Sequence, residues 1–553
     1  MTTELRGVPA ASGAAIGAPW IHQPAGPQRS ARTTVPAAAA AAAAELEALA
    51  ERLRAEGQAA EAEIFDAQAL MAADPELLDA ATSAVDAGAD PVAAIGDTGE
   101  TVAATFEALD DEVLSARAAD VRDVCARIAR HLVGAAAPRL HQRSIVVAVD
   151  LPPSVTVELD RALLAGIALE GGSRTSHAAI LARGLGIPAV VGVPDLVRIA
   201  TGAGELAIDG DAGRLVVEPD DGVRADIAGR AAADGDRRAA DASFAALPLA
   251  TSDGHRVLCA ANIGEPGEAL GAFAAGAEGI GLFRTEFAFA GRSTAPNEQD
   301  QADAYATVLE SAGGAPVVVR LADIGGDKPL PYLPIPTEAN PFLGVRAIRL
   351  AASHPDLFPT QVRAILAASA RTGRQASIMA PMVADADDVA LVRGLVRDAL
   401  AAVPDAPAPR VGIMVEVPSA VLLADALARE VDFMSIGTND LTAYLLAADR
   451  TNAALAARQD PCHPAVLRAV ARVVEAAAAA GDCEVAVCGE MAGDPVGALL
   501  LVGLGVDELS MEPSAFGAVK RAVASRTIDE LRTLGTAAQV ASSADAVRAL
   551  VAA

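Results

Sequence analysis

The feature that most restricts how this sequence can fold is a regular alternation of short apolar segments and alanine-rich segments from residue 247 to residue 553. The apolar segments have the length of buried strands, and the stretches between them favour helix. Eight successive strand–helix units over this length predict a (β/α)8 TIM barrel, whose functional site lies at the C-terminal ends of its strands. The expected strands are 257–262, 279–284, 316–321, 378–382, 411–416, 433–437, 485–488 and 508–511.

Charged and polar residues follow these strands, where the strand ends of a barrel would meet. Arginine binds planar and tetrahedral oxyanions with two parallel hydrogen bonds, so several arginines at one barrel mouth predict an anionic ligand. The carboxylates of Glu416 and Asp440 favour Mg²⁺ that bridges to a substrate phosphate. The candidate site residues in this half are Arg284, Arg320, Lys328, Arg346, Glu416, Asn439, Asp440, Arg450 and Cys488.

Two alternatives apply to these residues. The charges could pair with one another on a solvated rim, which is reasonable for any single residue but less so for the whole set. Buried cysteines are usually inert, yet Cys488 ends an expected strand directly before Gly-Glu-Met, which makes it a candidate proton donor.

A second concentrated signal lies at residues 171–183, Gly-Gly-Ser-Arg-Thr-Ser-His-Ala-Ala-Ile-Leu-Ala-Arg. The two glycines allow a ligand to approach the backbone closely, and the apolar run from Ala178 predicts a helix that begins near His177. A helix N-terminus favours an anion, so a neutral imidazole there is suited to accept a phosphoryl group. The alternative is a capped helix with a half-buried, structural histidine.

The remaining sequence predicts three further parts. Residues 1–20 and 144–220 contain short strands and are expected to form one α/β domain that carries His177. Residues 21–143 interrupt it with a helical pattern, in which Asp74-Pro75 and Asp90-Pro91 mark helix starts. We expect an inserted bundle of four or five helices that serves as a docking or scaffold module. Residues 221–246 are expected to form a linker helix between this half and the barrel of 247–553.

Composition excludes several classes of protein. A net charge of −29 argues against non-specific binding to nucleic acid or anionic membranes. The five cysteines are scattered and form no CxxC motif, which is typical of a reducing compartment rather than of a disulfide framework or zinc site. No signal peptide or membrane-spanning run is evident, so we expect a cytoplasmic protein without membrane insertion.

Seven motifs, in this order along the chain, resemble those of the Enzyme I family, the phosphoenolpyruvate–protein phosphotransferases. Related dikinases and synthases carry a large ATP-grasp domain, for which this sequence has neither the length nor a glycine-rich nucleotide loop. The motifs cover residues 7–17, 171–183, 281–287, 323–328, 340–349, 437–442 and 488–494.

The resemblance implies a function and a set of roles. The chain would transfer the phosphoryl group of phosphoenolpyruvate to Nε2 of His177, release pyruvate, and pass the group to the carrier HPr docked on the helical domain, the first step of sugar phosphotransfer. Such a cycle requires a swivel about residues 221–246, and the family is typically a homodimer through the barrel domain. The implied roles are substrate binding by Arg284, Arg320, Asn439, Asp440 and Arg450, assistance with phosphate charge by Lys328 and Arg346, Mg²⁺ binding by Glu416 and Asp440, and protonation of the enolate by Cys488.

One departure and two rival functions accompany this hypothesis. Phe65-Asp66-Ala67-Gln68 stands where the family usually has Phe-Glu-Ala-His, which leaves the details of the HPr contact open. A regulatory protein could bind phosphoenolpyruvate without transferring its phosphate, and a metal-dependent lyase or aldolase could use the barrel alone, with a structural His177. The sugars and downstream carriers served are not indicated.

Overall fold

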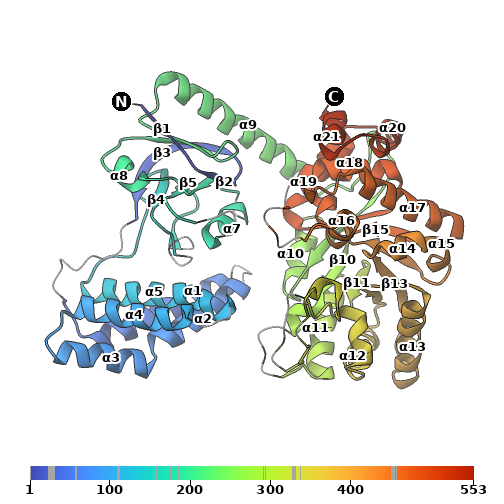
Figure 1. The fold of residues 1–553 in the computed structure, drawn as a ribbon, viewed down its shortest axis with the longest axis horizontal. Coiled ribbons are helices and arrows are strands. Elements are labelled where there is room, and N and C mark those ends of the chain that lie inside the picture. The colour runs from blue at the N-terminus through green and yellow to red at the C-terminus, as the bar shows by residue number, and fades with distance from the viewer. Residues whose placement is uncertain are drawn as a thin grey trace. The chain divides into compact units, whose positions relative to one another are not determined.

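The computed structural model describes residues 2–552 apart from 23–30, 56–58, 109–111, 153–154, 156–157, 173–175, 185, 290–291, 293, 327–329, 331, 337, 450–451, 453–454 and 456–457. It divides into two compact units, Met1–Arg237 and Arg238–Ala553 (Figure 1). Among the described helices, none combines the length and apolar character needed to cross a bilayer.

An eight-stranded sheet forms the α/β part of the first unit, in the order β1-β8-β7-β3-β4-β5-β6-β2. Strand β3 pairs in parallel with β4, from Ala18 beside Ser144 to Ile21 beside Val147, although a long helical segment separates them in the sequence. The helical segment is therefore inserted into the sheet, as predicted. The strands are β1 Thr3–Arg6, β2 Val8–Ala11, β3 Ala14–Ile21, β4 Ser144–Ala148, β5 Leu164–Leu169, β6 Ala189–Val191, β7 Leu206–Asp209 and β8 Arg214–Val217.

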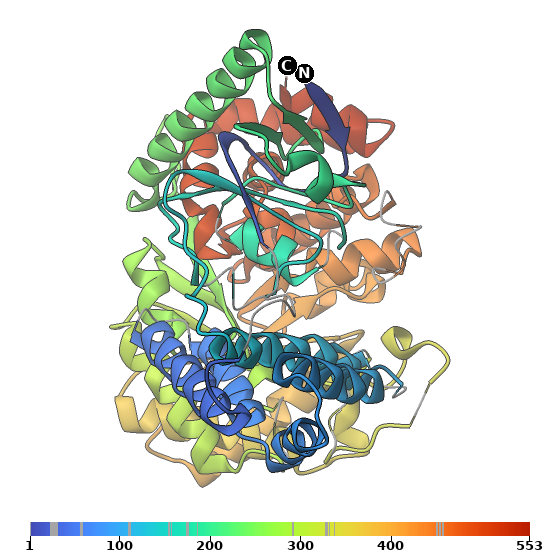
Figure 2. The same ribbon diagram turned by 90° about the vertical axis from the view of Figure 1, so that its left-hand side faces the viewer.

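The insertion is a five-helix bundle, drawn in blue and teal (Figure 2). Asp74 and Asp90 cap α3 and α4: each carboxylate accepts hydrogen bonds from two backbone N–H groups, and a proline follows each aspartate. The predicted helix starts at these two residues are therefore confirmed. The helices are α1 Val35–Ala55, α2 Ala59–Ala72, α3 Pro75–Asp86, α4 Pro91–Glu107 and α5 Glu112–Leu132.

A long helix, α9 (Asp221–Ala245), continues from the first unit into the second. Near its start, Nε of Arg224 donates to Glu205, the residue directly before β7, at 2.9 Å. At its end, the buried ammonium group of Lys520 donates to the carbonyl oxygens of Ala245 and Gly276, each at 2.7 Å. The start of α9 is therefore hydrogen-bonded within the first unit, and its end within the second.

The second unit is a closed barrel of eight parallel strands, in the order β10-β11-β12-β13-β14-β15-β16-β9. These are the eight predicted strands, with ends that differ by no more than two residues. The last strand pairs with the first, so that Leu509 lies beside Cys259 and Met511 beside Ala261. The strands are β9 Leu258–Ile263, β10 Gly279–Arg284, β11 Val317–Arg320, β12 Ser377–Ala380, β13 Arg410–Val415, β14 Phe433–Ile436, β15 Glu484–Val487 and β16 Glu508–Met511.

Helices surround this barrel and bury the outer faces of its strands in one large apolar core. A separate interior cluster contains Leu282, Val318, Met379, Met414, Phe433 and Cys488. The main helices are α10 Glu268–Ala274, α11 Glu298–Ser311, α12 Leu357–Thr372, α13 Ala386–Ala402, α14 Pro418–Leu422, α15 Ala424–Leu427, α16 Thr438–Leu446, α17 Pro464–Ala480, α18 Pro495–Leu504, α19 Phe516–Ala524, α20 Ile528–Gln539 and α21 Ala544–Ala552.

Candidate active site

Arg320, the last residue of β11, lies in a buried group of ion pairs at the C-terminal end of the barrel. Its Nη2 donates to Oε1 of Glu286 at 2.5 Å, and its Nη1 lies 3.6 Å from Oδ2 of Asp323. The same Glu286 oxygen accepts the backbone N–H of Asp323 at 2.8 Å. All three side chains are buried, so Arg320 is held in place from two sides.

Arg346 continues the same group and is only 3% exposed. Its Nε and Nη2 donate to the two oxygens of Asp323 at 3.1 and 2.7 Å, and Nη2 also donates to Asp440 at 3.3 Å. Burial alone would lower the pKa of Arg346, but these carboxylates outweigh it and raise the pKa. The guanidinium therefore stays charged in the interior and links β11 to α16.

Glu416 directly follows β13 and is 2% exposed. Its Oε1 accepts the backbone N–H of Met382 at 2.7 Å, and Met382 has a positive φ of 59° that is unfavourable for this residue type. Burial raises the pKa of Glu416 above its ordinary value, and repulsion from Asp440 and Asp323 adds to the effect. Carboxyl groups are therefore crowded together at this point.

The balance of charge in this group fits a divalent cation. Four carboxyl groups, those of Glu286, Asp323, Glu416 and Asp440, accompany only two buried guanidinium groups, those of Arg320 and Arg346. The excess is negative, and carboxylate oxygens are the ligands that Mg²⁺ prefers. Over the described part of the chain, no cluster of three or more His, Cys, Asp or Glu side chains has metal-binding geometry, so Glu416 and Asp440 would need oxygens of a substrate or water to complete a site.

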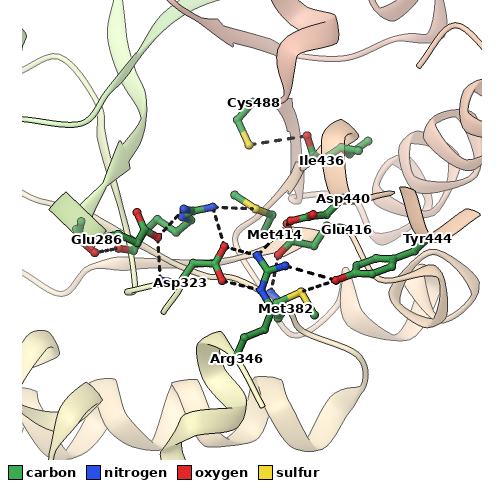
Figure 3. A network of polar contacts seen from close by, with 12 residues as sticks. Glu286, Asp323, Arg346, Met382, Met414, Glu416, Ile436, Asp440, Tyr444 and Cys488 are labelled. Atoms are coloured by element: carbon green, nitrogen blue, oxygen red, sulfur yellow. Dashed lines mark hydrogen bonds and ion pairs between the residues drawn. The ribbon is translucent and has the colours of Figure 1, made fainter. Parts of the chain in front are cut away.

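Cys488 directly follows β15 and is 3% exposed. Its Sγ lies 3.8 Å from the carbonyl oxygen of Ile436, to which the thiol donates (Figure 3). Burial raises the pKa of Cys488 to about 11, although Ser435 and Arg320 act in the opposite direction. The thiol therefore keeps its proton at neutral pH and can act as an acid.

Two predicted residues of the same barrel end are more accessible. The side chain of Arg284 is 35% exposed, and its Nη1 lies 3.4 Å from Oε1 of Glu512. Asn439 is exposed; its Oδ1 accepts the backbone N–H of Glu490 at 2.9 Å and its Nδ2 donates to the Glu490 carboxylate at 3.2 Å. Arg284 and Asn439 can therefore meet an incoming ligand, unlike the buried arginines.

Three predicted residues fall wholly or partly outside the described part of the structure. Lys328 and Arg450 are not described. His177 is the first residue of helix α7 (His177–Gly184), as the sequence predicted, but its side chain and residues 173–175 are not described. The roles assigned to these side chains remain predictions.

The alternative of ion pairs on a solvated rim is wrong for Arg320 and Arg346, because their ion pairs are buried. Both arginines were predicted site residues, but their partners, Glu286 and Asp323, were not. Both partners lie inside the motifs quoted for the family resemblance, and the need to balance buried arginines was a signal that could have identified them.

The sequence also did not predict a buried hydrogen-bond network that holds the backbone at Arg320. Gln361 of α12 accepts the backbone N–H of Ala322 at 2.9 Å and donates to the hydroxyl of Thr285 at 2.9 Å. That hydroxyl donates to the carbonyl oxygen of Arg320 at 2.8 Å. A glutamine in the middle of an ordinary helix carries no sequence signal for such a contact.

The departure at Gln68 lies in the interior of the helical bundle. Gln68 is fully buried, and its Nε2 donates to Oδ1 of Asp120 on α5 at 3.0 Å. Glutamine in place of histidine at this position therefore changes an internal hydrogen bond that joins α2 to α5.

Comparison with protein families gives three matches that together span most of the chain. The N-terminal domain of PEP-utilising enzymes matches residues 6–117, their mobile domain matches 140–213, and their PEP-binding domain matches 238–528. The last match alone includes every candidate residue of the barrel.

Three similar proteins each match more than four fifths of this chain. The phosphoenolpyruvate-protein phosphotransferase of Geobacillus stearothermophilus is 41% identical over 497 residues, which are 87% of this chain and 86% of that protein. The protein of the same name from Bacillus subtilis is 41% identical over 463 residues, 82% of this chain and 81% of that protein. A multiphosphoryl transfer protein of Rhodobacter capsulatus is 43% identical over 495 residues, but these are only 59% of its own length.

One solved structure is similar to part of this chain. The solution structure of an Enzyme I protein is 31% identical and covers 42% of this chain and 99% of its own, with a TM-score of 0.35.

Proposed function

Because this chain belongs to the family of phosphoenolpyruvate–protein phosphotransferases, the Enzyme I proteins, we propose that it transfers the phosphoryl group of phosphoenolpyruvate to its own His177 and then to a histidine of the carrier HPr. This is the first step of the phosphotransferase system. The observation that carries the site assignment is the buried, preorganised set of arginines and carboxylates at the barrel's C-terminal end, within the match to the PEP-binding domain.

Substrate binding is assigned to the barrel arginines. Arg284, Arg320 and Arg450 bind the phosphate and carboxylate of phosphoenolpyruvate together with Asn439. Arg320 needs little rearrangement, because Glu286 and Asp323 already fix its guanidinium. Donors that are oriented before the substrate arrives lose little free energy to reorganisation during the reaction. Arg346 and Lys328 assist with the phosphate charge.

The cation of this site is assigned to Glu416 and Asp440. We propose Mg²⁺, which would neutralise charge on the phosphate as the P–O bond opens. The crowding of carboxyl groups around Glu416 supports the assignment, since a cation there would offset the burial and the repulsion that together raise the pKa of Glu416.

Cys488 is the proposed acid. When the phosphoryl group leaves, the enolate of pyruvate remains, and the Cys488 S–H bond breaks as a C–H bond forms at C3. A thiol whose pKa lies near 11 carries its proton at neutral pH, so the acid is ready in every turnover.

His177 is the proposed phosphoryl acceptor. Its place at the start of α7 supports the assignment, because a helix N-terminus stabilises added negative charge. We further propose that the α1–α5 bundle binds HPr, that a swivel about residues 221–246 brings His177 to each partner in turn, and that two chains associate through the barrel domain 247–553. Sugar uptake is the process that this chain would energise.

Incubation with [³²P]phosphoenolpyruvate and Mg²⁺ tests the proposal. We expect a label on the protein that is labile in acid and stable in base, that is absent from His177→Ala, and that moves to a histidine of added HPr. Pyruvate without a labelled protein would favour the lyase, and binding without either product would favour the regulatory protein.

The assignment of the acid is tested separately. Cys488→Ser should still bind phosphoenolpyruvate but form pyruvate more slowly. An unchanged rate of pyruvate formation would remove Cys488 from the mechanism.

A further inference from the structure

An asparagine inside the barrel holds the backbone of the proposed acid. Asn262 of β9 is 4% exposed, and its Nδ2 donates to the carbonyl oxygen of Cys488 at 3.1 Å. The two residues are far apart in sequence and lie on strands β9 and the end of β15, which are not neighbours in the barrel. The hydrogen bond therefore crosses one intervening strand, β16.

Ser510, on the intervening strand, braces the asparagine. Its hydroxyl donates to Oδ1 of Asn262 at 2.7 Å, and the residue is fully buried. Ser510 pairs in register with Ala260, two residues before Asn262 on the same face of β9. Both ends of the Asn262 amide are thus occupied, one by Ser510 and one by Cys488.

Packing does not require polar side chains at this place. The interior cluster nearby is formed by apolar residues, and buried polar groups are unfavourable unless they are hydrogen-bonded. Gly281 of β10 makes room for Ser510, because a Cβ atom at position 281 would lie only 2.6 Å from the hydroxyl oxygen of Ser510. Asn262 and Ser510 are polar among apolar neighbours, and their hydrogen-bond partners here are each other and the carbonyl oxygen of Cys488.

Cys488 is restrained on both sides of its Cα atom. Its backbone N–H donates to the carbonyl oxygen of Ile436 on β14 at 3.1 Å, and its carbonyl oxygen accepts from Asn262. Together these two hydrogen bonds fix the peptide groups that flank the residue and hence the direction of its Cα–Cβ bond. What remains is rotation about χ1, which places the sulfur, and about the Cβ–Sγ bond, which directs the S–H group that here donates to Ile436.

We infer that Asn262, braced by Ser510, is a positioning residue that aims the Cys488 thiol at C3 of the enolate. The inference rests on the proposed function. In the step concerned, the S–H bond of Cys488 breaks, the new C3–H bond forms with the electron pair of the enolate, and the thiolate then regains a proton from water. A misdirected thiol impairs this step and leaves the earlier breaking of the P–O bond intact.

Single-turnover kinetics with [³²P]phosphoenolpyruvate and Mg²⁺ separate the two steps. Labelling of the protein reports phosphoryl transfer, and the ultraviolet absorbance of free enolpyruvate against that of pyruvate reports protonation. In Asn262→Leu, which removes both hydrogen bonds at similar volume, we expect labelling within about threefold of wild type. Pyruvate formation on the enzyme should slow by roughly 10- to 100-fold, the range expected for a displaced catalytic group, and enolpyruvate should be released. Ser510→Ala should show the same uncoupling to a smaller extent.

Gln301→Leu is the matched control. Gln301 of α11 is also a buried amide that donates to a backbone carbonyl, that of Pro296, and accepts from a hydroxyl, that of Tyr305, but it lies outside the barrel interior. It should lower stability without releasing enolpyruvate.

If labelling and pyruvate formation in the variants are both unchanged, or both slowed by the same factor, the positioning role of Asn262 is wrong. That outcome would leave the proposed function intact. Wild-type protein that takes no label would overturn the proposed function and this inference with it. If Asn262→Leu does not fold by circular dichroism, Ser510→Ala decides by the same criterion.

Discussion

Two arginines, one in the helical bundle and one in the barrel, contact carboxylates in the same number but in opposite surroundings. Arg122 of α5 donates to Glu100 and Glu107 at 2.6 to 2.9 Å, and all three side chains are well exposed. Arg346 donates to Asp323 and Asp440 at 2.7 to 3.3 Å, and all three are buried.

The difference shows that ion pairs with similar donor–acceptor distances can contribute very differently to the stability of the protein. Water screens the partners of Arg122 and solvates whatever is left if one is removed, so exposed pairs contribute little. The partners of Arg346 have no such compensation, and removing one member leaves buried charge behind. The ion pairs of Arg346 therefore hold one another in place, as a binding site requires, whereas those of Arg122 are replaceable.

The strongest test of this contrast is Arg346→Met, which keeps the volume of the side chain and removes its charge. We expect the barrel to lose about 3–5 kcal/mol, because Asp323 and Asp440 stay buried without their cation, and labelling by phosphoenolpyruvate to fall sharply. Hydrogen exchange of β11 and β13 measures the loss; tryptophan fluorescence would not, since the single tryptophan, Trp20, lies in the first unit. Arg393→Met, at an exposed ion pair with Glu430, is the control. Equal losses in both variants would contradict the comparison.

Glu508→Gln tests a half-buried acid at the opposite end of the barrel. Burial, reinforced by Glu484, raises the pKa of Glu508 from an ordinary 4.5 to about 7. The folded state therefore holds the proton more tightly than the unfolded state, so stability should fall as pH rises from about 4.5 to about 7 and then level off. The variant should lack a fall on the order of 2–3 kcal/mol. Parallel pH profiles of wild type and variant, from unfolding in urea, would show that this carboxyl is not involved.

Lys520→Met removes the buried ammonium group at the end of α9. The carbonyl oxygens of Ala245 and Gly276 would lose their charged donor, at a cost of about 2 kcal/mol. We expect increased hydrogen exchange in the last turn of α9 while the sheet of the first unit is unaffected. Protection that is unchanged in that turn would mean that other contacts fix the helix end.

Arg122→Gln should have the smallest effect. We expect no measurable shift of the first unit's unfolding midpoint, followed by the fluorescence of Trp20 in β3 or by circular dichroism, because the partners of Arg122 remain in water. A clear destabilisation would show that this exposed group behaves like the buried one.

Most of the fold could be predicted from sequence, because strand length and helix capping are local properties. The eight barrel strands follow from short apolar segments, and the starts of α3 and α4 follow from Asp74 and Asp90 next to prolines. The location of Arg320 and Arg346 near the strand ends was also predictable.

Their burial was not, because it depends on partners brought together by the closure of the barrel. Nothing in the spacing of Glu286 and Asp323 indicates that both turn toward Arg320. The contact between Asn262 and Ser510 likewise depends on how the first strand meets the last, which no local pattern encodes.

The pairing of β9 with β16 also determines when the molecule can be finished during its synthesis. The first unit emerges from the ribosomal exit tunnel long before residues 508–511 do, so the N-terminal sheet and bundle can fold cotranslationally. The barrel must wait with an open seam until β16 has left the exit tunnel, since distant partners cannot pair sooner. A premature stop codon even shortly before β16 would therefore yield a well-folded N-terminal half attached to an unclosed, aggregation-prone remainder.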